Sequence, residues 1–147
     1  MLVKTILKAK ARGAGVVTVS PDASVAEAAK LLATNRIGAL IAVEPDGAIA
    51  GILSERDIVR GVALQGELCL RAIVRDLMTA AVLTCHEDDT IESLMQTMTA
   101  KRVRHLPVID ADSKLMGIVT IGDVVKTRLD EASMEVDNLR HYVSASR

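Results

Sequence analysis

Hydrophobic positions along the chain follow two periodicities, which occur twice in the same order. Short runs rich in β-branched residues, VVTV at 16–19 and VLTC at 82–85, are typical of strands. After each run, apolar residues recur at intervals of three and four, over 25–32 and again over 91–98, which predicts a helix. Two further apolar segments and a second helical stretch complete each copy. The pattern predicts the order strand, helix, strand, strand, helix, repeated once.

Capping and turn residues mark the ends of these elements. The sequence SVAE at 24–27 is a capping box, and Thr90 is the expected N-cap of the corresponding helix in the second copy. Pro45-Asp46-Gly47 predicts a turn between two strands. The last helix of each copy is expected to begin just after Ser54 or Thr120. The continuous apolar character of the strands indicates burial on both faces.

A constant offset of 66 residues relates the two copies, without a gap from residue 15 to residue 60. Identical pairs include Val16 and Val82, Arg36 and Arg102, Gly51 and Gly117, and Asp57 and Asp123. A unit of about 50 residues with one apolar sheet face is marginally stable on its own. We therefore expect a pseudo-twofold pair in which each copy closes the open face of the other.

The composition excludes several classes of function. Half of the 147 residues are hydrophobic, and Tyr142 is the only aromatic residue, so the core must be aliphatic. A net charge of −1 provides no field for nucleic acid or an anionic membrane, and stacking platforms for single strands are missing. Cys69 and Cys85 lack metal-ligand spacing, which indicates free thiols and a cytoplasmic protein. The N-terminal MLVKTILKAK has no apolar run long enough for a signal peptide or a membrane span.

Candidate catalytic and metal-binding residues are few. His105 cannot be paired with a nucleophile on the basis of the sequence. Cys85 and His86 are neighbours on an expected strand and point to opposite faces, so they do not form a metal site easily. Gly13-Ala-Gly15 lacks the context of a dinucleotide fingerprint and is expected to be a turn. We expect no catalytic residue and no metal ligand.

The phrases GILSERD at 51–57 and GIVTIGD at 117–123 allow two interpretations. In the first, Ser or Thr followed by Asp three residues later only caps a helix, although capping boxes prefer Glu or Gln. In the second, the helix N-terminus and the hydroxyl attract a phosphate, while the carboxylate accepts hydrogen bonds from two ribose hydroxyls. The glycine that opens each phrase would let a ligand approach the backbone. The residues alone leave both interpretations open.

With its two signatures, this chain resembles the cystathionine-β-synthase-type (CBS) domain pair, or Bateman module. The resemblance rests on GILSERD and GIVTIGD, supported by RHLPV at 104–108 and DLMT at 76–79. It assigns residues 7–64 to the first CBS domain and 73–130 to the second, and leaves 131–147 as a C-terminal helical tail. It implies an α+β fold of two β-α-β-β-α repeats, with three- to four-stranded sheets packed against helices.

The resemblance also implies that adenosine nucleotides bind in two clefts between the copies. The ligand would be AMP, ADP, ATP or NAD(H), or sometimes S-adenosylmethionine, and no cofactor would be required. The implied contacts are Asp57 and Asp123 to the ribose, Ser54 and Thr120 to the phosphate, Thr18 and Thr84 near the adenine, and Arg104 and His105, in the same phrase as Pro107, to the phosphates.

The copies differ where these basic residues lie. Gly38, Ala39 and Ile41 occupy the positions that correspond to Arg104, His105 and Pro107. If the basic pair reaches across, the cleft built on Asp57 gains positive charge. The cleft built on Asp123 would then rely on Gly38 and on Arg56 or other nearby groups. One occupied cleft and two occupied clefts are both compatible with the sequence.

An apolar stripe at 129, 132, 136, 139 and 143 continues the last helix into the tail. It could pack on its own module or form an interface, and the resemblance favours a homodimer. We interpret the chain as a regulatory sensor whose bound nucleotide favours one orientation of the copies, which an unidentified target protein reads in trans. The alternatives are a purely structural module and a nucleotide-consuming enzyme. Neither a nucleic-acid partner nor a membrane partner is expected.

Overall fold

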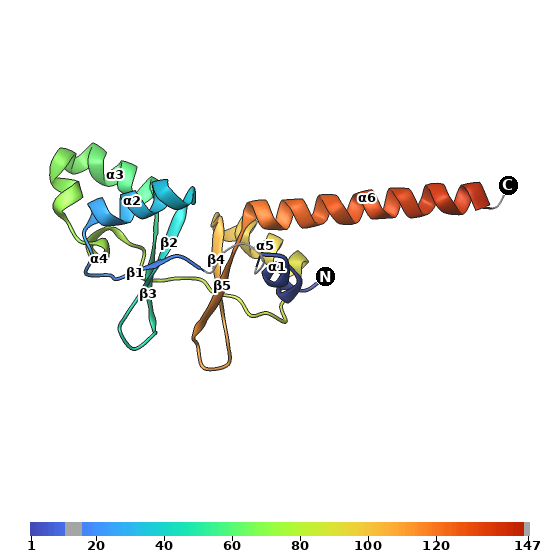
Figure 1. Cartoon of the computed structure of the whole chain (residues 1–147), viewed down its shortest axis with the longest axis horizontal. Coiled ribbons are helices and arrows are strands. Elements are labelled where there is room, and N and C mark those ends of the chain that lie inside the picture. Colours follow the sequence, from blue (N-terminus) through green and yellow to red (C-terminus); the bar gives the residue numbers. More distant parts are fainter. Residues whose placement is uncertain (11–15, 146–147) are drawn as a thin grey trace.

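The computed structural model describes residues 1–10 and 16–145, and the turn expected at 13–15 lies outside them. Two α+β halves lie side by side, and one long helix extends from the second half (Figure 1). In chain order the elements are α1 (Val3–Lys10), β1 (Thr18–Val19), α2 (Val25–Asn35), β2 (Ala39–Val43), β3 (Ile49–Ser54), α3 (Glu55–Gln65), the 3-10 helix η1 (Gly66–Arg71), α4 (Val74–Leu77), α5 (Ile91–Lys101), β4 (His105–Ile109), β5 (Leu115–Thr120) and α6 (Ile121–Ala145).

The expected helix starts are confirmed. The Ser24 hydroxyl accepts a hydrogen bond from the Glu27 amide at 3.1 Å, but the reciprocal half of the capping box does not form. Thr90 caps α5 by accepting from the Ser93 amide at 3.1 Å. The helices α3 and α6 begin directly after Ser54 and Thr120, as the repeat predicts.

The two sheets differ in size. In the first, β1 pairs in parallel with β2, and β2 pairs antiparallel with β3. In the second, β4 and β5 form an antiparallel pair, and the expected first strand is reduced to one parallel bridge between Cys85 and Val108. Pro107 explains the difference because it has no backbone N–H with which to extend the parallel ladder beyond Cys85. Three to four strands were expected in each sheet, so the second sheet is smaller than predicted.

Each half has its own aliphatic core rather than one core shared between two open sheet faces. The first contains Val19, Ala28, Leu32, Leu40, Ala42, Leu53 and Val74, and the second contains Val3, Ile6, Cys85, Ile91, Leu94, Met98, Leu106, Val108, Val119 and Val124. Burial on both strand faces holds for β2 but not for β3 and β5, in which buried and half-buried residues alternate toward the C-terminal end.

The halves are joined by a reciprocal exchange of short helices. The helix α4, which precedes the second copy, packs on the first copy, where the Val74 amide donates to the Ala23 carbonyl at 2.8 Å. The helix α1, which precedes the first copy, lies beside α5 and β5 (Figure 1), and the Val3 amide donates to the Asp89 carbonyl at 2.9 Å. Each copy is therefore completed by a segment that precedes the other copy in sequence.

The two glycines that open the repeated phrases make this exchange possible. A Cβ on Gly51 would lie 2.6 Å from the Met78 sulfur, and a Cβ on Gly117 would lie 2.7 Å from Leu7. Both distances are too short for a side chain. These glycines therefore allow close packing of the exchanged segments, which is a structural role beside the ligand approach considered above.

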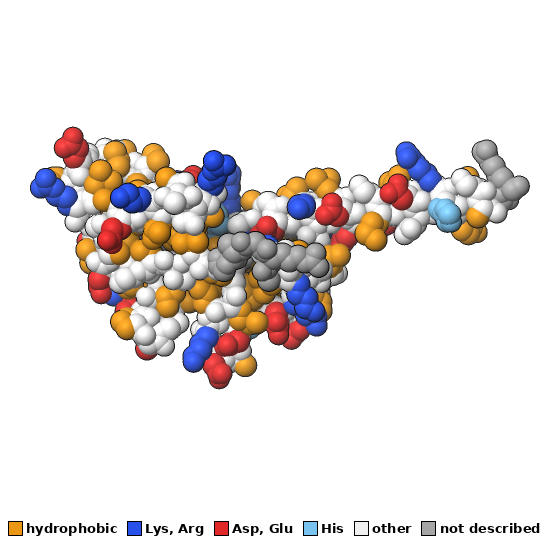
Figure 2. Space-filling model, in the orientation of Figure 1, with side chains coloured by type: hydrophobic (Ala, Val, Ile, Leu, Met, Phe, Trp, Pro, Cys, Tyr) orange, Lys and Arg blue, Asp and Glu red, His pale blue; other side chains and the backbone are white. Residues whose placement is uncertain are grey.

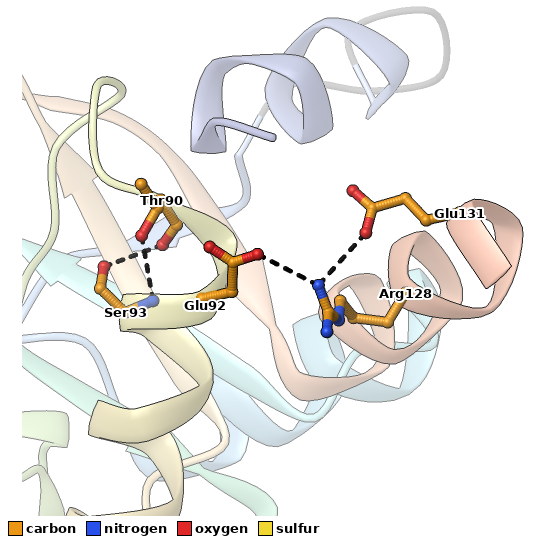
Figure 3. A network of polar contacts seen from close by, with 5 residues as sticks. All are labelled: Thr90, Glu92, Ser93, Arg128 and Glu131. Atoms are coloured by element: carbon orange, nitrogen blue, oxygen red, sulfur yellow. Dashed lines mark hydrogen bonds and ion pairs between the residues drawn. The ribbon is translucent and has the colours of Figure 1, made fainter. Parts of the chain in front are cut away.

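The last helix, α6, is continuous from Ile121 to Ala145, which confirms that the tail extends the second repeat. Its first part is fixed to α5 by Arg128, which lies 3.3 Å from Glu92 and 3.3 Å from Glu131 (Figure 3). Within residues 1–10 and 16–145, no helix is both long and apolar enough to cross a membrane.

Candidate functional site

Two cavities lie between the halves, and Gly38 and His105 line both of them. One has a volume of about 460 Å³ and includes Ser54 and Asp57, so we call it the Asp57 cleft. The other, of about 590 Å³, includes Lys10 and Thr120. Because Lys10 and Thr120 both hydrogen-bond Asp123, we call it the Asp123 cleft. Both volumes lie within the usual range of small-molecule sites.

At the Asp57 cleft, β3 ends and α3 begins. The Ser54 amide donates to Asp57 Oδ2 at 2.9 Å, and the Asp57 amide donates to the Ser54 hydroxyl at 3.2 Å, which completes a capping box. The second carboxylate oxygen, Oδ1, accepts no hydrogen bond from any residue in the described part of the chain. Ser54 and Asp57 therefore cap the helix, as the first interpretation predicts. Asp57 Oδ1 still has the capacity to accept hydrogen bonds from a ligand.

The Asp123 cleft repeats this arrangement with one addition. The Thr120 amide donates to Asp123 Oδ2 at 2.9 Å, and the Asp123 amide donates to the Thr120 hydroxyl at 3.1 Å. Lys10, the last residue of α1, also donates to Oδ2 at 2.8 Å. Burial raises the pKa of Asp123, but the hydrogen bonds and charge of Lys10 and the bonds from Thr120 outweigh it and lower the pKa below its ordinary value.

Lys10 replaces a backbone group of the first copy. In that copy the Thr79 amide donates to the Ile52 carbonyl at 2.9 Å. In the second copy the corresponding carbonyl, of Ile118, accepts from Lys10 Nζ at 2.8 Å. One ammonium thus satisfies a strand carbonyl and neutralises the carboxylate beside it, so the two clefts are chemically different.

Three arginines line the Asp57 cleft, beside the carboxylates of Glu55 and Asp57. Arg102 and Arg104 of the second copy line it, together with Arg56 of the first copy. The structure places Arg104 and His105 of the second copy in the lining of the Asp57 cleft, the arrangement in which the basic pair reaches across. Arg56 lines the Asp57 cleft rather than the Asp123 cleft, where it was expected, because it lies two residues into α3, beside its own Asp57.

His105 lies where the two cavities meet. An added Cβ on Gly38 would lie 3.6 Å from His105 Nε2, an ordinary contact distance, so the two residues are close neighbours across the copies. Burial lowers the pKa of His105, and the charges of Lys10 and Arg104 lower it further, against the opposing effect of Asp123 and Glu55. The imidazole is therefore neutral at neutral pH.

Four expected site residues do not line either cavity, and one of them, Asp123, lies directly behind the lining residues Lys10 and Thr120 that hydrogen-bond it. Thr18 and Thr84 are exposed, and Pro107 is buried in β4. Aliphatic and backbone groups lie there instead: Val16, Val17 and Ile118 in the Asp123 cleft, and Ile52 and Thr79 in the Asp57 cleft. These aliphatic side chains can pack against a flat base, and no Phe, Tyr or Trp is among the residues that line the two cavities.

Two further cleft residues were not among the expected ones. Arg36 lines the Asp123 cleft and Arg102 the Asp57 cleft. Each ends the first helix of its copy in the left-handed conformation, with φ of 53° at both, where glycine is usually preferred. The same residue, arginine, ends the first helix of both copies, at a position where arginine costs backbone energy. This repetition in the sequence could have indicated a functional role.

The clefts offer groups for binding rather than for bond breaking. Carboxylates, helix N-termini and arginines can hold hydroxyls and an anion. Burial, with a smaller contribution from Asp89, raises the pKa of the Cys85 thiol to about 12, which makes it a poor nucleophile. In residues 1–10 and 16–145, no three His, Cys, Asp or Glu side chains are placed to hold a metal ion together.

Comparison with known families decides the identity of the fold. A family model described as "CBS domain" matches residues 14–64 and 74–130. The chain belongs to the CBS domain family. The two matches coincide with the two copies and contain both the Ser54–Asp57 and Thr120–Asp123 pairs, so the clefts described above lie between two CBS domains.

Solved CBS structures share this architecture. The CBS-domain containing protein ATU1752 from Agrobacterium tumefaciens is 45% identical, with a TM-score of 0.81 over 86% of this chain and 92% of that one. The CBS domain pair of MJ0100, solved with 5-methylthioadenosine and S-adenosyl-L-methionine, is 28% identical, with a TM-score of 0.78 over 89% and 98%. CBSX2, solved with AMP, is 29% identical, with a TM-score of 0.70 over 80% and 90%.

Proposed function

We propose that this protein is a regulatory module that binds an adenosine nucleotide in the Asp57 cleft and has no catalytic activity of its own. Similar CBS domain pairs have been solved with AMP, S-adenosyl-L-methionine and 5-methylthioadenosine. These ligands share an adenosine group and differ in what is attached to its 5′ carbon. A site for this class therefore needs an acceptor for the ribose and a separate surface for the 5′ group.

The observation that carries the proposal is the arrangement of the Asp57 cleft. Asp57 Oδ1 is available to ribose hydroxyls, while three arginines, Arg56, Arg102 and Arg104, line the same cavity. In the first turn of α3 the Glu55 amide already donates to the Gly38 carbonyl at 2.9 Å and the Asp57 amide to the Ser54 hydroxyl at 3.2 Å, so the arginines are the main donors available to a phosphate. This combination favours a ligand with at least one phosphate, such as AMP, ADP, ATP or NAD(H).

Lys10 makes the Asp123 cleft the weaker of the two. The charge of the Asp123 carboxylate is already neutralised by an ammonium group 2.8 Å from Oδ2, although Oδ1 accepts no hydrogen bond from the described residues. Breaking that contact would also remove the partner of the Ile118 carbonyl. We therefore propose one high-affinity nucleotide per chain, bound at Asp57.

Regulation follows from the position of the cleft between the two halves. A ligand that contacts Asp57 of one copy and Arg104 of the other favours the orientation in which both contacts form. We propose that a target protein in the cytoplasm reads this orientation in trans, and that the module acts as a homodimer. Both cysteines are free and buried, which is consistent with a reducing compartment.

The test is calorimetric titration of AMP into the wild type, Asp57→Asn and Asp123→Asn. Asparagine keeps an oxygen for the backbone amide of the capping box, so the helix start is preserved, but it loses the charged acceptor for two hydroxyls. We expect Asp57→Asn to weaken AMP binding by at least tenfold, because charge-assisted hydrogen bonds are lost. Asp123→Asn, its counterpart in the other copy, should change the affinity little.

Three results would contradict parts of this proposal. Equal AMP binding by Asp57→Asn and the wild type would exclude Asp57 as the ribose acceptor. Loss of binding only in Asp123→Asn would move the site to the other cleft. No heat with AMP, ADP, ATP, NAD or NADH, and no rise in melting temperature, would leave helix capping as the whole role of both phrases. That outcome would favour a purely structural module, an interpretation that the two complete capping boxes support.

A further inference from the structure

The C-terminal half of α6 extends away from the two halves of the molecule (Figure 1). Every residue from 132 to 145 is exposed. Hydrophobic side chains lie along this extension (Figure 2), and among them Met134 is 64%, Val136 47% and Leu139 64% exposed. A single helix of about 14 residues is marginally stable in water, so burial of this surface against a partner would stabilise it.

The exposed apolar residues of α6 form a continuous seam, which we define as Val125, Leu129, Ala132, Val136 and Leu139. Successive members are separated alternately by four and three residues, and the same spacing leads next to Val143. This is the heptad spacing of coiled coils, in which two positions of every seven face a partner helix. All five residues of the seam are exposed.

The seam is distinct from the face by which α6 packs on its own module. Val124 is buried, and Thr127 and Glu131 are half-buried on that packed face. Val125 and Ala132 each lie one position after a packed residue, about 100° around the helix, and Leu129 lies two positions after Thr127, about 200° around it. The seam can therefore meet a second helix while α6 stays attached to α5 through Arg128, as Figure 3 shows.

The residue types on the seam favour a two-stranded, parallel arrangement. In heptad terms Leu129 and Val136 occupy position a, and Val125, Ala132 and Leu139 occupy position d. A β-branched residue at a with Leu at d, as in Val136 and Leu139, favours parallel dimers. We propose that α6 forms a parallel two-stranded coiled coil with α6 of a second copy of this chain.

Charge complementarity supports the same orientation. In a parallel pair, position g of one helix faces position e of the next heptad on the other, so Glu135 would meet the partner's Arg140. Symmetry forms this pair twice. A fully overlapping antiparallel pair would instead bring Glu135 near the partner's Glu135 and Lys126 near the partner's Arg140. The like charges disfavour that alternative.

This inference gives a defined surface to the homodimer included in the proposed function, and it does not depend on nucleotide binding. The seam contains no residue that lines either cleft. Titrating AMP into a variant with an altered seam therefore tests nucleotide binding separately from dimerisation. Either proposal can fail without the other.

The test compares Leu139→Glu with Met134→Glu by analytical ultracentrifugation of the full chain. Both positions are apolar and 64% exposed on the same helix, but Met134 lies off the seam. The wild type and Met134→Glu should sediment as dimers that dissociate on dilution. Leu139→Glu should be a monomer at concentrations at which the wild type is dimeric, with its helical circular dichroism largely kept and AMP affinity unchanged.

Orientation is tested with Leu139→Cys under mild oxidation. A parallel pair places the two introduced thiols side by side and should give a covalent dimer, whereas antiparallel overlap would hold them about 15 Å apart along the axis. The proposal is overturned if the wild type is a monomer, or if both glutamate variants behave alike, whether as dimers or as monomers. It is also overturned if oxidation gives no cross-link through residue 139. A monomeric wild type that floats with anionic vesicles would assign the seam to a lipid surface instead.

Discussion

Lys10 distinguishes two clefts that the repeat would otherwise make equivalent. It belongs to α1, yet its ammonium lies against Asp123, 113 residues away in sequence. The corresponding contact in the first copy is made by a backbone amide, which carries no net charge. One lysine side chain therefore neutralises one of two otherwise equivalent carboxylates.

Replacing this lysine should open the second cleft. In Lys10→Met the Asp123 carboxylate loses its ammonium partner, so its full charge becomes available to ribose hydroxyls, as at Asp57. We expect the calorimetric stoichiometry of AMP to rise from one toward two per chain. Lys8→Met is the matched control, because Lys8 is an exposed lysine of the same helix, and it should keep one site. An unchanged stoichiometry in Lys10→Met would show that Lys10 does not block the cleft.

The same ion pair makes stability depend on pH. A carboxyl whose pKa is lowered by folding stabilises the folded state above its ordinary pKa, and this contribution disappears as pH falls through the folded value. The urea midpoint of Lys10→Met should therefore lie below that of the wild type at neutral pH, and the two should converge in acid. A constant gap down to about pH 3 would mean that lost packing of the lysine stem, rather than the ion pair, explains the difference.

His105 should couple nucleotide binding to proton uptake. Its pKa is lowered mainly by burial and then by Lys10 and Arg104, so the free protein holds it neutral. A phosphate beside the imidazole would raise that pKa, and binding at pH 7.5 would then take up protons. We expect the calorimetric enthalpy of AMP binding to depend on the ionisation enthalpy of the buffer in the wild type but not in His105→Gln. Equal buffer dependence in both proteins would place the phosphate away from His105.

At the scale of elements, local sequence patterns predicted the features that depend on contacts between residues close together in the chain, such as the helix starts. The starts of α3 and α6 follow from Ser54 and Thr120, whose hydroxyls reach amides only three residues away. The 66-residue offset then placed the corresponding elements of the two copies. Pro107 was visible as a difference between the copies, but its effect on the second sheet depends on a parallel partner strand that lies far away in sequence.

The exchanged helices were beyond the reach of such patterns. The packing of Leu7 against Gly117 joins residues that are distant in the chain, and nothing in the local sequence of α1 shows which copy it completes. The placement of Lys10 depends on that packing, so the difference between the clefts was attributed to Arg104, His105 and Arg56 alone. Arg36 and Arg102 could have been recognised, because a repeated arginine where a helix ends is unusual.

At the scale of the whole molecule, the exchange makes each half depend on a segment that precedes the other. The two clefts lie between the halves, so their geometry depends on both exchanged helices. Val3 of α1 is completely buried in the core of the second half, and Val74 of α4 is completely buried in the core of the first. These two valines are equivalent positions in the exchange and provide a matched pair for testing it.

Val3→Ala should loosen the second half, although the substitution lies at the N-terminus. The loss of two buried carbon groups and the cavity left behind should reduce the free energy of unfolding by about 2 kcal/mol. Hydrogen exchange followed by mass spectrometry should show faster exchange in β4, β5 and α5, whereas β2, β3 and α2 should be nearly unchanged. Val74→Ala should give the opposite pattern.

Faster exchange confined to α1 in Val3→Ala would show that the helix frays without supporting the second core. Equal effects in both halves would mean that the molecule opens as one cooperative unit, in which the exchanged helices transmit a local change to both clefts at once.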